Sequence, residues 1–136
     1  MNVGILLITH DNIGALLLRT AIDILGICPL SASALPAPPD CDTEAVLVEA
    51  RQLAQQLDSG DGVLVLTDLY GATPSNIACC LHRFHEVRVV SGLNLPMLIR
   101  VLNYPDLDLE GLRQKAVSGG RDGVLTCTIE GGRNAE

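Results

Sequence analysis

The chain has 136 residues, of which 48% are hydrophobic and only 2% aromatic, so we expect one domain with an aliphatic core. Its formal net charge of -7 at pH 7 argues against nucleic acid or an anionic membrane surface as a direct partner.

The start of the chain lacks the basic residues and the Ala-x-Ala site of a secretory signal, and no apolar run approaches the roughly 18 residues of a membrane helix. The cysteines show no C-x-x-C spacing, which favours reduced thiols over a disulfide framework or a zinc site. We therefore expect a cytoplasmic protein without a bound metal. The cysteines are Cys28, Cys41, Cys79, Cys80 and Cys127.

The first ten residues contain a nearly unbroken apolar run that ends abruptly at Thr9 and His10. Such a run predicts a strand that is buried on both faces. Apolar residues then recur from Ile13 to Leu25 with the spacing of one helix face, and Gly26 follows where that helix would end.

A second strand is predicted over Leu30 to Leu35, and a second helix opens at Asp42 or Thr43. The strongest strand pattern, Val63 to Thr67, ends in Asp68.

A loop follows that becomes a third helix, with Thr73 predicted as its N-cap and Pro74 as its first residue. Val87 to Ser91 is predicted as a fourth strand. Beyond it, Gly92 to Met97 forms another strand-to-helix junction, and Asp106 to Asp108 separates two helical pieces.

Gly119 to Gly123 is predicted as a turn before a last strand, Val124 to Ile129. The alternating order predicts an α/β fold, doubly wound, with a mostly parallel sheet and helices on both faces. Because the last strand alternates and is polar, we expect it to be an antiparallel edge. We expect a single domain over residues 1–130 and a disordered tail over residues 131–136.

Polar residues follow several of these strands: His10 after the first, Asp68 after the third, and Gly92 to Asn94 after the fourth. In open parallel sheets, ligands gather at the carboxyl ends of strands. If the first and third strands are neighbours, His10 and Asp68 can come within hydrogen-bonding distance. A carboxylate on one imidazole nitrogen then leaves the other free as a nucleophile. Beside this pair, the helix that opens at Thr73 offers free amides that favour an anion. Together these residues indicate a site that carries a phosphoryl group.

Each residue also has a purely structural explanation. A histidine at a strand end can be a solvated loop residue, Asp68 can cap a turn, and Thr73-Pro74 is an ordinary helix start. His82 and His85 fall late in the third helix and receive no functional role.

On these residues the chain resembles the enzyme IIA component of the mannose family of the bacterial phosphotransferase system (PTS). The matching stretches occur in the family's order and cover nearly the whole domain. They are Ile8–His10, Thr67–Asn76, Gly92–Leu98 and Gly120–Val124.

The resemblance implies a phosphotransferase whose His10 accepts a phosphoryl group from phospho-HPr and passes it to a IIB component acting in trans, for sugar uptake. It implies that Asp68 orients the histidine and that Thr73, with Gly71, Ala72 and Ser75, receives the phosphoryl oxygens. The resemblance implies no metal or organic cofactor. It implies that the protein contacts the membrane only indirectly, through a permease.

The family is usually a homodimer that exchanges its last strand, which here would be Val124 to Ile129. Two alternatives stay open: a regulatory module that signals by its phosphorylation state without a cognate permease, and the phosphoryl-donor subunit of a dihydroxyacetone kinase. The stretches Tyr70–Asn76 and Gly92–Leu98 look more like the mannose type.

Overall fold

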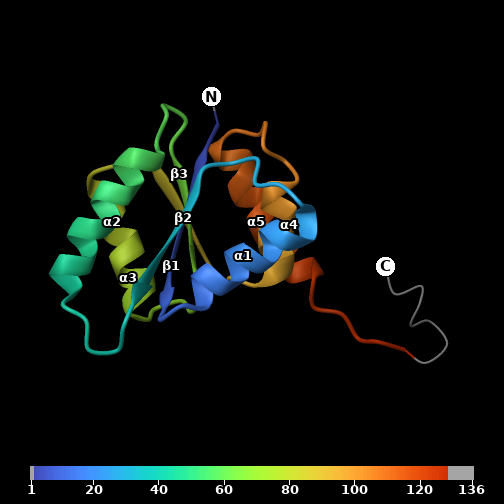
Figure 1. The fold of residues 1–136 in the computed structure, drawn as a ribbon, viewed down its shortest axis with the longest axis horizontal. Helices are drawn as coiled ribbons and strands as arrows, with labels where there is room; N and C mark the ends of the chain where they lie inside the picture. The colour runs from blue at the N-terminus through green and yellow to red at the C-terminus, as the bar shows by residue number, and fades with distance from the viewer. Residues whose placement is uncertain (1, 129–136) are drawn as a thin grey trace.

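The computed structural model describes residues 2–128, in which strands and α-helices alternate along the chain (Figure 1). In chain order the elements are β1 (Gly4–His10), α1 (Ile13–Leu25), β2 (Ala32–Ala37), α2 (Thr43–Leu57), β3 (Val63–Thr67), α3 (Thr73–Cys80), the 3-10 helix η1 (Leu81–Arg83), β4 (Val87–Ser91), α4 (Leu95–Leu102) and α5 (Leu109–Asp122).

The four strands form one parallel sheet in the order β2-β1-β3-β4. In its register Leu7 pairs with Ala34 on one side and Leu66 on the other. All carboxyl ends therefore lie at one edge of the sheet. The predicted α/β doubly wound fold is confirmed.

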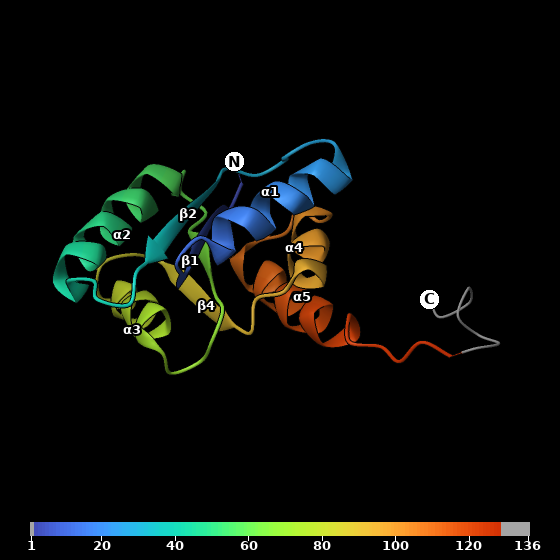
Figure 2. The same ribbon diagram turned by 60° about the horizontal axis from the view of Figure 1, so that its bottom comes forward.

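Helices cover both faces of the sheet: α2 and α3 lie on one face, and α1, α4 and α5 on the other (Figures 1 and 2). Alternate residues of the central strands point into two separate cores. Leu7 and Leu66 belong to the core under α1, α4 and α5, whereas Leu6 and Val65 belong to the core under α2 and α3. Burial on both faces explains why these strands read as continuous apolar runs.

Local signals set several boundaries as predicted. Helix α1 spans Ile13–Leu25, and Gly26 follows in the left-handed conformation with φ of 81°. Helix α2 begins after Asp42, whose carboxylate accepts the N–H groups of Glu44 and Ala45 at 3.1 and 3.4 Å. The side chain of Asp42 thus fixes the start of α2, and the left-handed conformation of Gly26 fixes the end of α1.

The second strand begins two residues later than predicted, at Ala32, and runs through Pro36 to Ala37. The prediction ended the strand before this proline because a proline cannot donate a ladder hydrogen bond. Strand β2 lies at the edge of the sheet. An edge strand tolerates a proline whose missing N–H would face away from its neighbour, and Pro36 still pairs in register with Thr9.

The prediction of a turn over Gly119 to Gly123 was wrong, because α5 continues to Asp122. Both Gly119 and Gly120 are buried against α4. A Cβ atom at Gly119 would lie 2.7 Å from Cβ of Arg100 and 3.3 Å from the carbonyl oxygen of Pro96. These glycines therefore allow two helices to approach closely and do not mark the end of one.

The predicted last strand does not form over residues 124–128 of the described chain. Val124 and Leu125 are 78% and 67% exposed, and the segment extends away from the body of the protein (Figures 1 and 2). A strand needs a neighbour to satisfy its backbone, and within one chain this segment reaches none. Exchange of the segment in a dimer stays a prediction. Ile129 and the predicted tail lie outside the described residues.

Between residues 2 and 128, the helices are all too short or too polar to cross a membrane.

Candidate active site

His10 is the last residue of β1, and Asp68 directly follows the neighbouring strand β3. The Nδ1 atom of His10 lies 2.8 Å from Oδ2 of Asp68. The backbone N–H of His10 donates to the same oxygen at 3.1 Å. The sheet order therefore brings together two residues that the sequence placed at the ends of the first and third strands, and the carboxylate holds both the ring and the backbone of the histidine.

The two side chains differ in exposure: 42% for His10 and 13% for Asp68. Burial alone raises the pKa of Asp68, but the hydrogen bonds from the ring and the backbone of His10 lower it, with the net pKa below its ordinary value. Asp68 is thus a carboxylate at neutral pH and can only accept a hydrogen bond. Nδ1 of His10 must then donate, so Nε2 is the nitrogen that carries the lone pair in the neutral ring.

The other carboxylate oxygen, Oδ1 of Asp68, is buried and has no hydrogen-bond partner within residues 2–128. Both hydrogen bonds from His10 converge on Oδ2, so the full interaction is carried by one oxygen. This geometry fixes the side of the ring that faces the protein. The opposite, Nε2 side belongs to a half-exposed ring that another molecule can reach.

The loop after Asp68 leads into α3 by way of Gly71, which has a φ of 83°, and Ala72, which is the N-cap. The carbonyl oxygen of Ala72 accepts the N–H of Asn76 at 3.0 Å. Thr73 is the first helical residue, so α3 begins one residue earlier than predicted, and no side chain caps the helix. The exposed Thr73 hydroxyl is therefore not used in capping.

The start of α3 leaves amide groups available, because the first N–H groups of a helix have no intrahelical acceptor. Thr73 and Ser75 each carry such a group, whereas Pro74 has none. The Ser75 side chain is buried, with 2% exposure, so its contribution to a ligand would come from its amide. These groups and the helix dipole favour a negatively charged ligand.

The third polar strand end has a structural role. The side chain of Asn94 accepts the N–H of Met97 at 2.9 Å, which caps α4. The same side chain donates to the carbonyl oxygen of Gly120 at 3.1 Å, which ties α4 to α5. Gly92, with φ of 87°, makes the turn before it. Asn94 therefore holds two helices together.

His82 and His85 lie near the amino ends of the strands, opposite the carboxyl ends where His10 and Asp68 meet. His82 is in η1, which follows α3. Glu86, the residue after His85, accepts the N–H of Val63 at the beginning of β3 through its carbonyl oxygen, at 3.0 Å.

Across the described part of the chain, no group of three or more His, Cys, Asp and Glu side chains is arranged to hold a metal ion.

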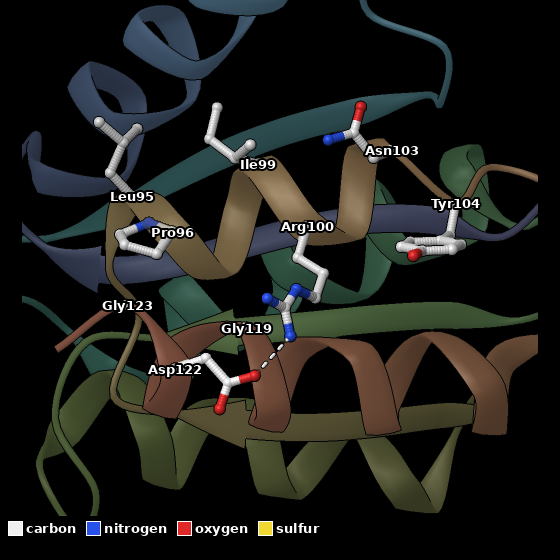
Figure 3. Close-up of a pocket in the computed structure, with 9 residues that line it drawn as sticks. All are labelled: Leu95, Pro96, Ile99, Arg100, Asn103, Tyr104, Gly119, Asp122 and Gly123. Atoms are coloured by element: carbon white, nitrogen blue, oxygen red, sulfur yellow. Dashed lines mark hydrogen bonds and ion pairs between the residues drawn. The ribbon is translucent and has the colours of Figure 1, made fainter. Parts of the chain in front are cut away.

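A groove of about 720 Å³ lies between α4 and α5 (Figure 3), and His10 is not among the residues that line it. Arg100 crosses it and forms an ion pair with Asp122 at 2.8 Å, and these are its only charged lining residues (Figure 3). Because the two charges are paired with each other, neither is free to act as a nucleophile or a base. The candidate active site is the pair of His10 and Asp68 at the carboxyl ends of β1 and β3.

Thr9 was not singled out from the sequence, although it adjoins His10 directly. It is buried, with 1% exposure, and its Oγ1 accepts the N–H of Gly14 at 2.8 Å. The sequence feature that could have identified Thr9 is its position, a hydroxyl residue that interrupts an apolar strand immediately before the histidine.

Residues 4–115 match the model of a family, EIIA-man, described as "PTS system fructose IIA component". The mannose-specific EIIAB component of the PTS from Escherichia coli K12 is 32% identical over 127 residues, which cover 91% of this chain and 39% of that protein. The chain thus spans about two fifths of the length of this relative.

Two solved structures are similar to this one. The mannose/sorbose-specific IIA subunit from Enterococcus faecalis superposes with a TM-score of 0.84 and 24% identity, covering 95% of this chain and 97% of that one. A PTS IIA protein associated with the fucose utilization operon of Streptococcus pneumoniae gives a TM-score of 0.72 and 28% identity, covering 87% and 90%. The first similarity concerns the fold alone.

Proposed function

The chain belongs to the EIIA-man family of IIA components of the phosphotransferase system, and from this premise we propose that it is a phosphocarrier that accepts a phosphoryl group on Nε2 of His10. The observation that carries the proposal is the pair of hydrogen bonds from His10 to Oδ2 of Asp68. They leave a half-exposed ring with one nitrogen oriented and the other free.

The proposed donor is phospho-HPr, in which the phosphoryl group is bonded to a histidine. Nε2 of His10 attacks phosphorus, so that an N–P bond forms on His10 while the N–P bond of the donor breaks. The electron pair of the broken bond stays on the donor nitrogen. The proton on Nδ1 of His10 remains hydrogen-bonded to Asp68, whose negative charge stabilises the cationic ring as the bond forms.

The phosphoryl oxygens need donors on the side opposite to Asp68. We assign this role to the hydroxyl of Thr73 and to the backbone amides of Gly71, Thr73 and Ser75 in the loop and at the start of α3. The amide of Ala72 already donates to the carbonyl oxygen of Leu69 at 3.3 Å and would have to exchange that partner for a phosphoryl oxygen. The positive φ of Gly71 gives this loop its turn. In the second half of the cycle, the phosphoryl group passes from His10 to a nucleophile on a separate IIB component, in the cytoplasm.

This function is tested by incubating the protein with phosphoenolpyruvate, enzyme I and HPr, and then with a purified mannose-type IIB component. The protein should acquire an acid-labile phosphate and lose it when IIB is added. The same mixture without HPr is the control for direct labelling. A protein that stays unlabelled in the complete mixture would contradict the phosphocarrier role.

We further propose a homodimer in which each copy contributes its Val124–Thr128 segment to the sheet of the other. Strand β4 is the last strand on its side of the sheet. A groove of about 580 Å³ lies between β4 and α5, lined in part by Val89 and Val117. An extended, alternating segment from a second copy fits such a groove and would satisfy the free edge of β4.

The dimer is tested by sedimentation of the wild-type protein and of a Thr126→Pro variant, since proline removes a ladder donor. We expect a wild-type dimer and a variant that dissociates, with Thr126→Ala as the control that keeps the backbone N–H. A monomeric wild-type protein would rule out the exchange.

Two other functions of His10 can be distinguished from sugar uptake by the molecule that receives its phosphoryl group. A regulatory module would be labelled by HPr without passing the group to any IIB component. A dihydroxyacetone kinase donor would support phosphorylation of dihydroxyacetone by its kinase subunits. A gene neighbourhood with IIB, IIC and IID components would favour transport.

A further inference from the structure

The turn between β1 and α1 carries His10 and is held by one buried hydroxyl group. Oγ1 of Thr9 accepts the backbone N–H of Gly14 at 2.8 Å. Gly14 is the second residue of α1, where an amide has no intrahelical acceptor, and Asn12 at the N-cap provides no side-chain bond. Thr9 therefore caps the helix from within the preceding strand.

The same hydroxyl donates to the carbonyl oxygen of Asp11, at 3.4 Å. Asp11 has a φ of 43°, the one positive value found for a non-glycine residue in the described chain. Residues other than glycine adopt this conformation only where their surroundings hold them in it. Thr9 thus has hydrogen bonds to both sides of the turn, to Asp11 and to Gly14.

Steric contacts reinforce these hydrogen bonds. A Cβ atom at Gly14 would lie 3.1 Å from both Oγ1 and Cγ2 of Thr9 and 3.2 Å from Cβ of Leu7. These distances are shorter than ordinary carbon–carbon contacts of about 3.5–4.0 Å. Helix α1 therefore approaches β1 as closely as a glycine allows, and the Thr9 side chain fills the space between them.

We propose that Thr9 is a positioning residue for phosphoryl transfer: its hydroxyl fixes the β1–α1 turn so that the ring of His10 stays hydrogen-bonded to Asp68. This inference rests on the proposed function of His10. Thr9 does not touch the reacting atoms. It acts through the backbone of His10, whose N–H donates at 3.1 Å to Oδ2 of Asp68, the same oxygen that lies 2.8 Å from Nδ1 of the ring.

The test is the variant Thr9→Val, which keeps the shape of the side chain and removes the hydroxyl. The maximal rate of His10 phosphorylation by phospho-HPr should fall about 10- to 100-fold, the scale of a misplaced reacting group. The donor concentration for half-maximal rate should stay unchanged, because the docking surface is intact. Thr9→Ser, which restores the hydroxyl, should recover the rate.

Thr20→Val is the matched control. Thr20 lies on α1, and its hydroxyl donates to the carbonyl oxygen of Leu16 at 2.8 Å on an exposed surface. Removal of this hydroxyl should leave the rate unchanged. If Thr9→Val does not fold, Gly14→Ala disturbs the same contact from the side of the helix and should lower the rate in the same way.

A second readout does not require phosphorylation. Nitrogen-15 NMR of the His10 ring should show a single tautomer, protonated on Nδ1, in the wild-type and Thr9→Ser proteins, and a mixture of tautomers in Thr9→Val. A folded Thr9→Val protein with the wild-type rate and the wild-type tautomer would overturn the inference. A wild-type protein with one tautomer that is never labelled would instead count against the proposed function alone.

Discussion

One carboxylate oxygen of Asp68 holds His10 at two points: Oδ2 accepts the backbone N–H at 3.1 Å and lies 2.8 Å from Nδ1 of the ring. The two residues are 58 positions apart and meet because β1 and β3 are neighbours in a parallel sheet. The backbone hydrogen bond fixes the position of the main chain of His10, and the ring hydrogen bond fixes the orientation of its imidazole.

The first prediction concerns the charge of Asp68. Asp68→Asn keeps the size of the side chain but removes the negative charge that holds the proton on Nδ1 and stabilises a phosphorylated ring. The rate of labelling by phospho-HPr should fall at least about tenfold. Asp61→Asn, at an exposed aspartate in the turn before β3, is the control and should be labelled at the wild-type rate. An unchanged rate in Asp68→Asn would remove the carboxylate from the mechanism.

The lowered pKa of Asp68 also predicts how stability depends on pH. Burial opposes this shift, and the hydrogen bonds from His10 produce it. A carboxyl group whose pKa is lower in the folded protein stabilises the fold fully above its unfolded pKa of about 3.9, and this contribution is lost as pH falls through the folded pKa. The difference in free energy of unfolding between wild type and Asp68→Asn should therefore shrink below about pH 4. Urea unfolding at pH 7 and at a series of acid pH values measures it, and a difference that stayed constant would contradict the shift.

Thr73 tests the phosphoryl-binding loop. Thr73→Val removes the exposed hydroxyl at the start of α3 and leaves the backbone amides in place. The transfer rate should fall about tenfold or more, the scale on which one hydrogen-bond donor to a developing charge contributes. Thr73→Ser should retain most of the rate, because it keeps the hydroxyl. Equal rates for the serine and valine variants would show that the hydroxyl takes no part.

The contact between α4 and α5 gives a prediction about stability alone. In Gly119→Ala the new methyl group would lie 2.7 Å from Cβ of Arg100, so one helix must move. The free energy of unfolding should fall by about 1–3 kcal/mol, although alanine favours a helix over glycine. Thermal or urea unfolding measures the change, with the exposed α5 substitution Gln114→Ala as the control. A more stable Gly119→Ala protein would show that the helices have room to separate.

Those parts of the fold that depend on local pattern could be predicted from the sequence. Strands β3 and β4 and helix α1 have the predicted bounds, because buried strands and amphipathic helices leave different periodicities. The meeting of His10 and Asp68 was predictable on the condition that β1 and β3 are neighbours. The order of the strands, which satisfies that condition, came from the structure.

Other features depend on contacts that no local pattern carries. Gly119 and Gly120 looked like a turn because glycine is common there, and only the packing of α5 on α4 shows why glycine is required. The alternation of Val124 to Ile129 predicted a strand, but a strand also needs a neighbour, and residues 124–128 find none within the described part of the chain. Thr9 has its role through Gly14 and Asp11, both beyond the end of the strand that contains it.

The central claim is that Asp68 turns the ring of His10 so that Nε2 receives the phosphoryl group. It is tested most directly by phosphorus-31 and nitrogen-15 NMR of the protein phosphorylated with phosphoenolpyruvate, enzyme I and HPr, beside His10→Ala and a His82→Ala/His85→Ala control. We predict one phosphohistidine, bonded through Nε2 of His10, that is present in the control and absent from His10→Ala. A phosphoryl group on Nδ1 of His10, or a label that survives His10→Ala, would contradict it.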